Sequence, residues 1–224
     1  MPIAKSIING VRANSELGGI HASIREYYST CIKTHGPTPR GVDWESLATQ
    51  QMRLVQLMKV CDWSTSFSLN DLGCGYGALL ALISERYRDT SVDYLGVDLS
   101  PAMVTAARRR WRERKNARFI VGSESPRLAD YSVASGIFNV RLDHSTKDWS
   151  RLIRSTLEQL HATSKLGFSV NFLSTTSTGP DCAAELFITD AKPWTRFCKD
   201  ALNAKVELIN NYGMNEFTLL VRRD

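Results

Sequence analysis

A cluster of three glycines between an apolar run and a helical run constrains the fold of this chain most strongly. The apolar run covers residues 67–72, the glycines are Gly73, Gly75 and Gly77, and the helical pattern begins at residue 78. A strand, a tight glycine turn and a helix in this order open the nucleotide-binding units of α/β proteins. The glycines permit a sharp turn and leave no side chain between the backbone N–H groups and a ligand. The stretch therefore predicts an α/β fold with a ligand-binding turn.

The spacing of the glycines separates two classes of ligand. Dinucleotide sites carry a G-x-G-x-x-G pattern, in which a pyrophosphate rests on the helix N-terminus. Here Asp71 lies two residues before Gly73, and the third glycine comes one residue too early for that pattern. A carboxylate at this position repels a pyrophosphate but can anchor an ammonium group, directly or through water. The stretch 71–77 resembles motif I of the class I S-adenosylmethionine (SAM)-dependent methyltransferases, which implies that the loop approaches the methionine part of SAM.

A second acidic position follows the glycine loop. The short apolar strand 94–97 leads into Asp98, roughly 20 residues past the loop, where Rossmann-like units place a ribose-binding carboxylate. The two oxygens of Asp98 can accept hydrogen bonds from both ribose hydroxyls. Ser100 and Pro101 then supply the N-cap and the first turn of a helix. The alternative interpretation is an α/β domain with a coincidental glycine turn.

The resemblance implies a fold and a set of cofactor contacts. The expected fold is a Rossmann-like, seven-stranded, mostly parallel α/β sheet with an antiparallel terminal hairpin, plus an N-terminal helical cap. Strands are predicted at residues 67–72, 94–98, 117–121, 131–137, 166–173, 205–209 and 216–221. The family often has an acid after the third strand that binds the adenine amino group. The residues expected to contact SAM are Asp71, Gly73, Cys74, Gly75, Gly77, Asp98, Leu99, Met103, Ser123, Glu124 and Ser135.

The first 64 residues precede the predicted SAM-binding core, residues 65–224, within one globular domain. Residues 17–33 show helical spacing, whereas residues 1–15 show no clear period. Prolines exclude a helix through residues 35–44, and a second helix extends to about residue 62 with Leu47, Ala48, Gln51, Val55 and Met58 along one side. In small-molecule methyltransferases that this chain resembles, such helices fold over the cofactor as a cap and exclude water.

Five residues are candidates for contact with the methyl acceptor. The cap contributes Tyr28, Arg40 and Trp44, and the core contributes Arg141 and Asn171. Ordinary core packing is the alternative for the two aromatic residues. The polar segment 174–181 is a candidate lid at the same edge of the sheet.

Methyl transfer from a sulfonium is an in-line displacement, to which a protein contributes chiefly alignment of the reactants. An oxygen acceptor usually also needs a base. His144, which follows the fourth predicted strand, and His35, in the proline-rich segment, are the candidate bases, and Asn139 is the third candidate catalytic residue. His21 is expected on a helix surface. A structural role is the alternative for each histidine. No cluster of histidines and carboxylates has metal-ligand spacing, so no metal is expected.

Composition also indicates the cellular compartment and the kinds of partner to expect. The sequence has no apolar run of about 20 residues and no signal-peptide core, so we expect a cytoplasmic protein without a membrane partner. Five cysteines without a C-x-x-C pair indicate reduced thiols. The net charge of +5 owes much to residues 108–115, which we interpret as a solvated helix face. An RNA-binding patch is the alternative interpretation of this run.

The sequence therefore predicts a SAM-dependent methyltransferase for a small metabolite or a sugar-bearing biosynthetic intermediate, acting on an oxygen or nitrogen atom as a monomer or homodimer. No nucleic-acid partner is expected, because the chain lacks the Asn-Pro-Pro-Tyr type of motif found in enzymes that methylate DNA bases. An RNA or protein methyltransferase that uses the arginine-rich surface is the second hypothesis. A SAM-binding protein without catalytic activity is the third.

Overall fold

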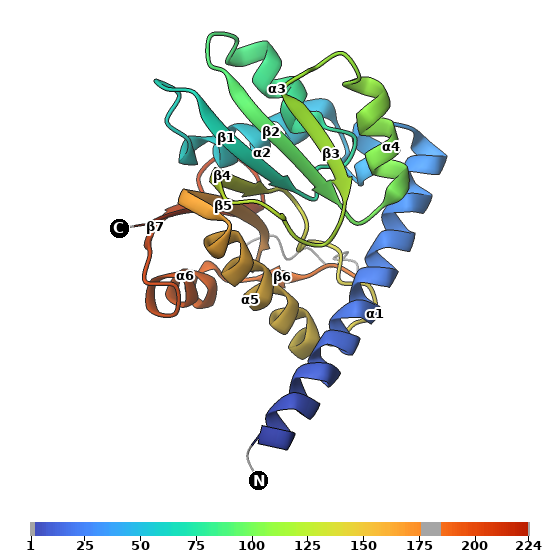
Figure 1. The fold of residues 1–224 in the computed structure, drawn as a ribbon, viewed down its shortest axis with the longest axis vertical. Helices are drawn as coiled ribbons and strands as arrows, with labels where there is room; N and C mark the ends of the chain where they lie inside the picture. Colours follow the sequence, from blue (N-terminus) through green and yellow to red (C-terminus); the bar gives the residue numbers. More distant parts are fainter. Residues whose placement is uncertain (1–2, 176–184, 224) are drawn as a thin grey trace.

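The computed structural model describes residues 3–175 and 185–223, with side chains from residue 17 onward. An eight-stranded mixed sheet lies at its centre (Figure 1). Its strands follow the order β3-β2-β1-β4-β5-β8-β7, and the short β6 pairs with β5 outside this path. In chain order the strands are β1 Phe67–Leu72, β2 Val92–Asp98, β3 Ala117–Val121, β4 Ala129–Ala134, β5 Ser164–Ser174, β6 Ile188–Thr189, β7 Lys205–Ile209 and β8 Glu216–Arg222.

The direction of the strands changes once across the sheet. From β3 to β5 each strand runs parallel to its neighbours, whereas β8 runs antiparallel to both β5 and β7. The predicted Rossmann-like, mostly parallel α/β fold with an antiparallel terminal hairpin is therefore confirmed. The additional strand β6 is absent from the prediction, because two residues carry no detectable alternation of apolar and polar positions.

The helices of the described residues are α1 Ile3–His35, α2 Leu47–Leu57, α3 Ala78–Arg86, α4 Pro101–Arg110, α5 Thr146–Ala162 and α6 Ala191–Asp200. Three of them begin at a serine cap. The hydroxyls of Ser46, Ser100 and Ser145 each accept the backbone N–H three residues later, which satisfies a donor that no helical carbonyl reaches. Within the described chain, no helix has the length and apolar character needed to span a membrane.

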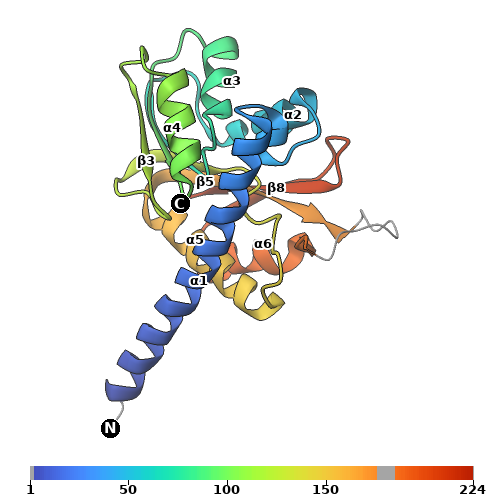
Figure 2. The ribbon, with the colours of Figure 1, turned by 90° about the vertical axis from the view of Figure 1, so that its right-hand side faces the viewer.

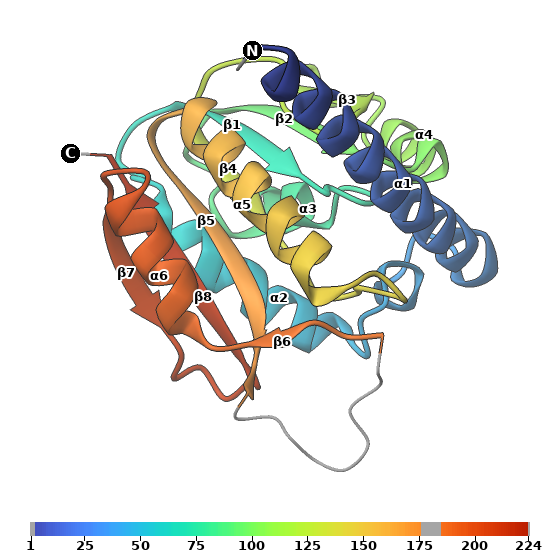
Figure 3. The same ribbon diagram turned by 90° about the horizontal axis from the view of Figure 1, so that it is seen from below.

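Two hydrophobic layers cover the two faces of the sheet. On one face, α5 and α6 bury residues such as Trp149 and Trp194 against the strands, and Figure 3 shows α5 between α1 and α6. On the other face, α2, α3 and α4 bury Leu57, Leu82 and Val104. Both faces are therefore filled by packing, and the carboxyl ends of the parallel strands are where a ligand site can form.

The longest helix, α1, lies close to this end of the sheet. It contacts α4 and α5, and the Oγ atoms of Ser29 and Ser100 lie 2.7 Å apart in a hydrogen bond. Figure 2 shows the C-terminal half of α1 passing α4 toward α2. A 3-10 turn, Pro39–Val42, packs against α1 and leads the chain back toward α2. The N-terminal helices are thus placed beside the residues that begin α4.

β2, β4 and β5 each begin two residues earlier than predicted, and three further boundaries also differ from the prediction. α1 begins at Ile3 instead of near residue 17, because no proline interrupts this stretch and extending a helix is easier than nucleating one. α2 ends at Leu57 and continues as a 3-10 turn, Met58–Val60, short of the predicted residue 62. β4 ends at Ala134 instead of residue 137, because the chain turns at Gly136 with a φ of +71°.

The buried face of α2 also differs from the predicted one. The residues that face the interior are Gln50, Arg53, Leu54 and Leu57. Leu47, predicted on the inner side, is 57% exposed. Met58, also predicted on that side, is fully buried. Gln50 and Arg53 lie inward because they have buried partners, which hydrophobic periodicity does not detect.

Candidate active site

A cavity opens at the carboxyl ends of β1, β2 and β4. The empty space within it and its open mouth together amounts to about 1070 Å³. Residues of α1, of the segment before α2 and of α2 itself form one side. The turns after β1, β2, β3 and β4, together with two residues of α5, form the other side. The cavity therefore lies where an open α/β sheet is expected to bind its ligand.

The glycine turn after β1 presents its backbone to the cavity. Gly75 has a φ of +53°, and a Cβ atom there would lie 2.9 Å from Cγ1 of Val42. Its N–H donates a hydrogen bond of 2.9 Å to Oδ2 of Asp98. Gly73 and Cys74 also line the cavity. Gly77 does not, because it faces Trp111, whose indole N–H donates to its carbonyl at 3.2 Å.

Asp98 is held by the two backbone segments that flank it in space. Its Oδ2 accepts from Gly75, and its Oδ1 accepts from the N–H of Ser100 at 2.8 Å. Burial raises the pKa of Asp98 to about 6, although these two hydrogen bonds act in the opposite direction. A carboxylate can accept about four hydrogen bonds, so each oxygen keeps capacity for a further donor. The residue therefore fits the role of binding the two hydroxyls of a ribose.

Asp71, at the end of β1, lines the same cavity and is 2% exposed. The hydroxyl of Tyr94 donates a short hydrogen bond to its Oδ2. Burial raises the pKa of Asp71 to about 7, the Tyr94 hydroxyl lowers it, and the charge of Asp98 raises it. A cation placed beside this carboxyl would favour its ionised form. The site therefore fits an ammonium group, as the sequence pattern predicts.

The loop after β3 contributes one of its two predicted residues. Ser123 lines the cavity, whereas Glu124 is exposed and lies outside the lining. His21 of α1 also lines the cavity, and its pKa is lowered by burial and raised to a smaller degree by the charge of Glu124. The predicted cofactor residues that the structure brings together are Asp71, Gly73, Cys74, Gly75, Asp98, Leu99, Met103, Ser123 and Ser135.

Aromatic residues form the side of the cavity away from the strands. Tyr28 and Trp44, both predicted to face the acceptor, line it. Burial raises the pKa of the Tyr28 phenol well above its usual range, and the nearby charge of Asp43 adds to this effect. Tyr28 is therefore protonated near neutral pH and can donate a hydrogen bond. Gln50 lines the cavity beside these residues, and its Oε1 accepts a hydrogen bond of 3.0 Å from the Tyr76 hydroxyl.

Three predicted acceptor-binding residues lie outside the cavity lining. Arg40 is exposed on the 3-10 turn. Arg141 donates from its Nη1 to the carbonyl of His144. Asn171 is fully buried, with Oδ1 accepting from the N–H of Gly136 at 2.8 Å and Nδ2 donating to Glu216 at 3.0 Å. The candidate lid, residues 174–181, lies for the most part outside the described residues.

The three predicted catalytic residues do not line the cavity either. His35 is exposed in the last turn of α1. Asn139 is buried, and His144 lies parallel to the Trp149 ring with 6.5 Å between ring centroids. Because β4 ends early, residues 139–142 pair with residues 185–187 through three backbone hydrogen bonds and one isolated β-bridge instead of lining the cavity, apart from Phe138 before them. These three side chains therefore lie outside the cavity lining, in contrast to the position expected from the sequence.

Sequence reasoning also missed residues that do line the cavity. His21 (expected on the helix surface), Ile24 and Arg25 lie on the same side of α1 as the predicted Tyr28 and line the cavity with it. Their helical spacing is visible in the sequence, so this face was detectable once α1 was placed over the site. The remaining lining residues without a sequence prediction include Val42, Gln50, Leu54, Tyr76, Gly136, Ile137, Phe138 and Thr156.

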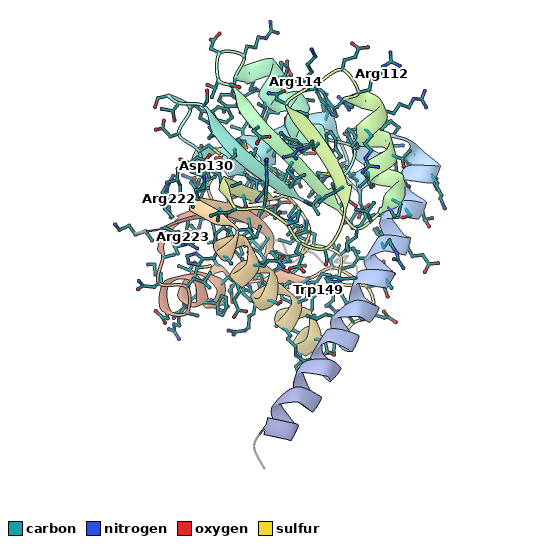
Figure 4. The ribbon with its side chains drawn as sticks, in the orientation of Figure 1. Arg112, Arg114, Asp130, Trp149, Arg222 and Arg223 are labelled. Carbon is teal, nitrogen blue, oxygen red and sulfur yellow. The ribbon has the colours of Figure 1, made fainter. Side chains whose placement is uncertain are left out.

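The arginine-rich run lies at the other end of α4 from the cavity. Arg112 and Arg114 follow the C-terminal end of this helix (Figure 4), whereas Ser100 at its N-terminal end lines the cavity. Arg108 is engaged structurally, since its guanidinium donates twice to the carbonyl of Phe119 at 2.7 and 2.9 Å. The run therefore forms a separate basic surface instead of a wall of the site.

Comparison with known proteins identifies relatives of this architecture. Residues 70–162 match a family model described as a methyltransferase domain. The chain is 45% identical over 166 residues to the Mycobacterium tuberculosis (strain H37Rv) protein named "Putative methyltransferase Rv1506c". That alignment covers 74% of this chain and 99% of the relative.

Solved structures share the fold at low sequence identity. The magnesium protoporphyrin IX methyltransferase ChlM from Synechocystis PCC 6803, with bound S-adenosylhomocysteine (SAH), has a TM-score of 0.64 at 13% identity, covering 91% of this chain and 99% of its own. The DhpI–SAH complex has a TM-score of 0.63 at 14% identity, covering 92% and 98%. An O-methyltransferase family protein from Burkholderia thailandensis has a TM-score of 0.57 at 17% identity, covering 80% and 56%. At these identities the likeness shows a common fold.

Proposed function

The chain belongs to the class I SAM-dependent methyltransferases, and we propose that it methylates a small metabolite or a sugar-bearing biosynthetic intermediate at an oxygen or nitrogen atom. The observation that carries this proposal is the form of the cavity. One side consists of backbone groups and buried carboxylates suited to the cofactor. The other side is an aromatic wall formed by Tyr28 of α1 and Trp44 of the segment before α2. A pocket walled in this way favours an acceptor of small size.

SAM, when bound, supplies a methyl group on a sulfonium, which is electrophilic without further activation. The residues of this chain hold the reactants. Asp98 accepts hydrogen bonds from the ribose hydroxyls, and Asp71 faces the ammonium group. Gly73 and Gly75 let the backbone of the loop approach the methionine part. Ser123 lies in the loop that the family uses for adenine. Alignment and exclusion of water are then the main contributions to the rate.

The acceptor is proposed to contact Tyr28, Trp44 and Gln50. Among the described lining residues, Asp71 and Asp98 have pKa values raised to about 7 and about 6, and burial lowers the pKa of His21. Asp71 and Asp98 are assigned to the cofactor. His21, which is neutral near pH 7 because burial lowers its pKa, is then the lining group left to accept a proton from the acceptor.

An RNA methyltransferase is the second candidate, and the basic surface around Arg112 and Arg114 is the observation that favours it. Phosphate contacts by such a surface would make binding strongly dependent on salt. The distance of this surface from the cavity along α4 counts against a role in presenting a base to the site.

One labelling experiment separates these functions. The protein is incubated with methyl-labelled SAM and a cell extract divided into small molecules, RNA and protein. We expect label in the small-molecule fraction and loss of transfer in the Asp98→Ala variant. Label in RNA or in protein would instead establish the alternative class. Calorimetry with SAH, and with a dinucleotide as control, tests the cofactor assignment independently of any acceptor.

A further inference from the structure

A closed set of contacts joins the aromatic wall to the turn after β4. The guanidinium carbon of Arg53 lies 3.7 Å from the centroid of the Trp44 ring. Arg53 Nε donates a 2.6 Å hydrogen bond to Oε1 of Glu216. Glu216 Oε2 accepts from Asn171 at 3.0 Å, and Asn171 Oδ1 accepts from the N–H of Gly136 at 2.8 Å. Gly136 in turn abuts Trp44, since a Cβ atom there would lie 2.5 Å from the ring.

The polar members of this set are buried. Arg53 is 8% exposed, Glu216 is 2% exposed and Asn171 is fully buried. Burial raises the pKa of Glu216, while the charge of Arg53 and the hydrogen bonds from Arg53 and Asn171 lower it. A buried ion pair of this kind contributes little net stability compared with apolar residues of similar volume, because both charges lose their hydration. Its placement therefore calls for an explanation other than stability.

The members differ in their relation to the cavity. Trp44 and Gly136 line it, whereas Arg53, Glu216 and Asn171 lie behind them. The side-chain oxygen of Asn171 accepts the hydrogen bond of the Gly136 N–H. Gly136 has a left-handed φ of +71°, which glycine adopts more readily than other residues. Arg53 covers part of the Trp44 ring from outside the lining. The buried polar residues thus fix both the ring and the turn against which the ring packs.

We propose that Arg53, Glu216 and Asn171 are positioning residues that hold Trp44 against the turn after β4 and so set the wall that the methyl acceptor meets. This inference rests on the proposed function, which assigns Trp44 to contact with the acceptor. Asn171, which the sequence analysis predicted to contact the acceptor directly, is thereby assigned an indirect role. The three residues come from α2, β8 and β5, so the set also ties the N-terminal helices to the sheet.

The test measures the position of Trp44 directly. Glu216→Gln keeps the shape of the side chain but removes the charge that holds Arg53. Quenching by acrylamide is measured for each variant with and without Trp44→Phe, so that the difference reports Trp44 alone. We expect the quenching constant of Trp44 to rise by about twofold or more in Glu216→Gln. Unchanged quenching of Trp44 would overturn the proposal.

A matched control separates positioning from general loosening. Glu207→Gln makes the same chemical change on β7, where Glu207 pairs with Arg222 on the surface at 3.0 Å. This control should leave Trp44 quenching unchanged. A purely structural network would lower the melting temperature of Glu216→Gln and leave the quenching of native Trp44 as it is.

A second variant covers the case in which Glu216→Gln does not fold. Arg53→Lys keeps the positive charge for Glu216 but loses the planar group that stacks on the indole, so it should also expose Trp44 to acrylamide. SAH affinity should stay within about twofold of the unmodified protein in Glu216→Gln, Glu207→Gln and Arg53→Lys, because none of these three side chains lines the cavity. If the unmodified protein does not bind SAH, the proposed function fails, while the quenching comparison still decides whether these residues position Trp44.

Discussion

The two sides of the cavity are built by different means. The cofactor side comes from two short stretches of chain, residues 71–75 and 98–103, whose backbone groups and carboxylates contact one another directly. The acceptor side is lined by residues of the N-terminal segment but is held in place by residues far apart in the chain, since its central ion pair joins residues separated by 163 positions. The first side is therefore specified by local sequence, and the second by how the whole chain packs.

This difference teaches what each side can tolerate. Backbone contacts on the cofactor side depend on turn geometry, so a single added side chain can remove several of them at once. The acceptor side depends on side chains, which can be exchanged one at a time while the sheet remains intact. Substitutions on the cofactor side should therefore reduce SAH affinity by large factors, and substitutions on the acceptor side should barely alter it.

The largest effect is expected for Gly75→Val. A Cβ atom at this position would lie 2.9 Å from Val42 and would force a residue with a φ of +53° into a strained conformation. The turn must then shift, which removes the N–H that Asp98 accepts and the space for the cofactor. We expect SAH affinity to fall by about a thousandfold or more, measured by calorimetry.

Gly213→Val is the matched control for that change. Gly213 also has a positive φ, of +73°, but a Cβ atom there meets nothing within 4 Å. It should cost stability through strain, about 1–2 kcal/mol, and leave SAH affinity unchanged. Equal effects of the two variants on SAH affinity would show that the glycine loop does not face the cofactor.

The next largest effect is expected for Asp98→Ala. The change removes the acceptor of both ribose hydroxyls, and hydrogen bonds to charged groups are each worth about 1.5–3 kcal/mol. We expect SAH affinity to fall by about a hundredfold, which follows from about 3 kcal/mol in total. Deoxyadenosine analogues of SAH should lose less affinity in this variant than in the unmodified protein. Calorimetry that gives the same affinity in both proteins would refute the ribose assignment.

The contrast between the two sides also explains what the sequence could reveal. β1 and the turn after it were predictable to the residue, because strand, glycine spacing and acidic positions all lie in one stretch. Asp98 followed from its place at the end of β2. The buried face of α2 was not predictable, since Gln50 and Arg53 lie inward only because Tyr76 and Glu216 are there to meet them.

The predicted catalytic residues lie outside the cavity lining for a related reason. Their assignment assumed that β4 continues to residue 137 and delivers the following segment to the cavity. The turn at Gly136 is stabilised by Asn171, which belongs to the next strand of the sheet. No local pattern around residues 134–144 records that contact. As a result, His144 and Asn139 lie outside the cavity lining, whereas Ser135 and Gly136 line the cavity.

A smaller effect, again on the cofactor side, is expected from pH. The pKa values of Asp71 and Asp98 are raised to about 7 and about 6 in the protein without ligand. A ligand that favours the ionised carboxylates binds less tightly as pH falls through these values, and its binding then releases protons. We expect SAH affinity to fall about tenfold between about pH 8 and about pH 6, as the ionised fraction of Asp71 falls about tenfold.

Asp71→Asn supplies the comparison for the pH experiment. This variant should bind SAH more weakly near neutral pH and show a flatter pH profile. The sign for stability is the opposite of that for affinity. Because the folded protein without ligand holds these protons more tightly than the unfolded chain, the two groups make it less stable as pH rises from about 4 to about 7. Calorimetry in buffers of different ionisation enthalpy counts the protons released; a count of zero at pH 6 would exclude Asp71 from the ammonium site.

The smallest effect is expected where the two sides meet. The 2.7 Å hydrogen bond between Ser29 and Ser100 joins α1 to the residue that caps α4 and whose N–H donates to Asp98. Ser29→Ala removes this bond, worth about 1 kcal/mol, without touching the cofactor contacts. We expect SAH to dissociate faster by less than about fivefold, measured by stopped-flow fluorescence, because α1 covers the cavity less firmly. Ser23→Ala is the control, since the Ser23 hydroxyl donates within α1, to the carbonyl of Gly19. If Ser29→Ala instead weakened SAH binding as strongly as Asp98→Ala, the helix would have to be counted as part of the cofactor site, and the division into a locally encoded side and an assembled side would not hold.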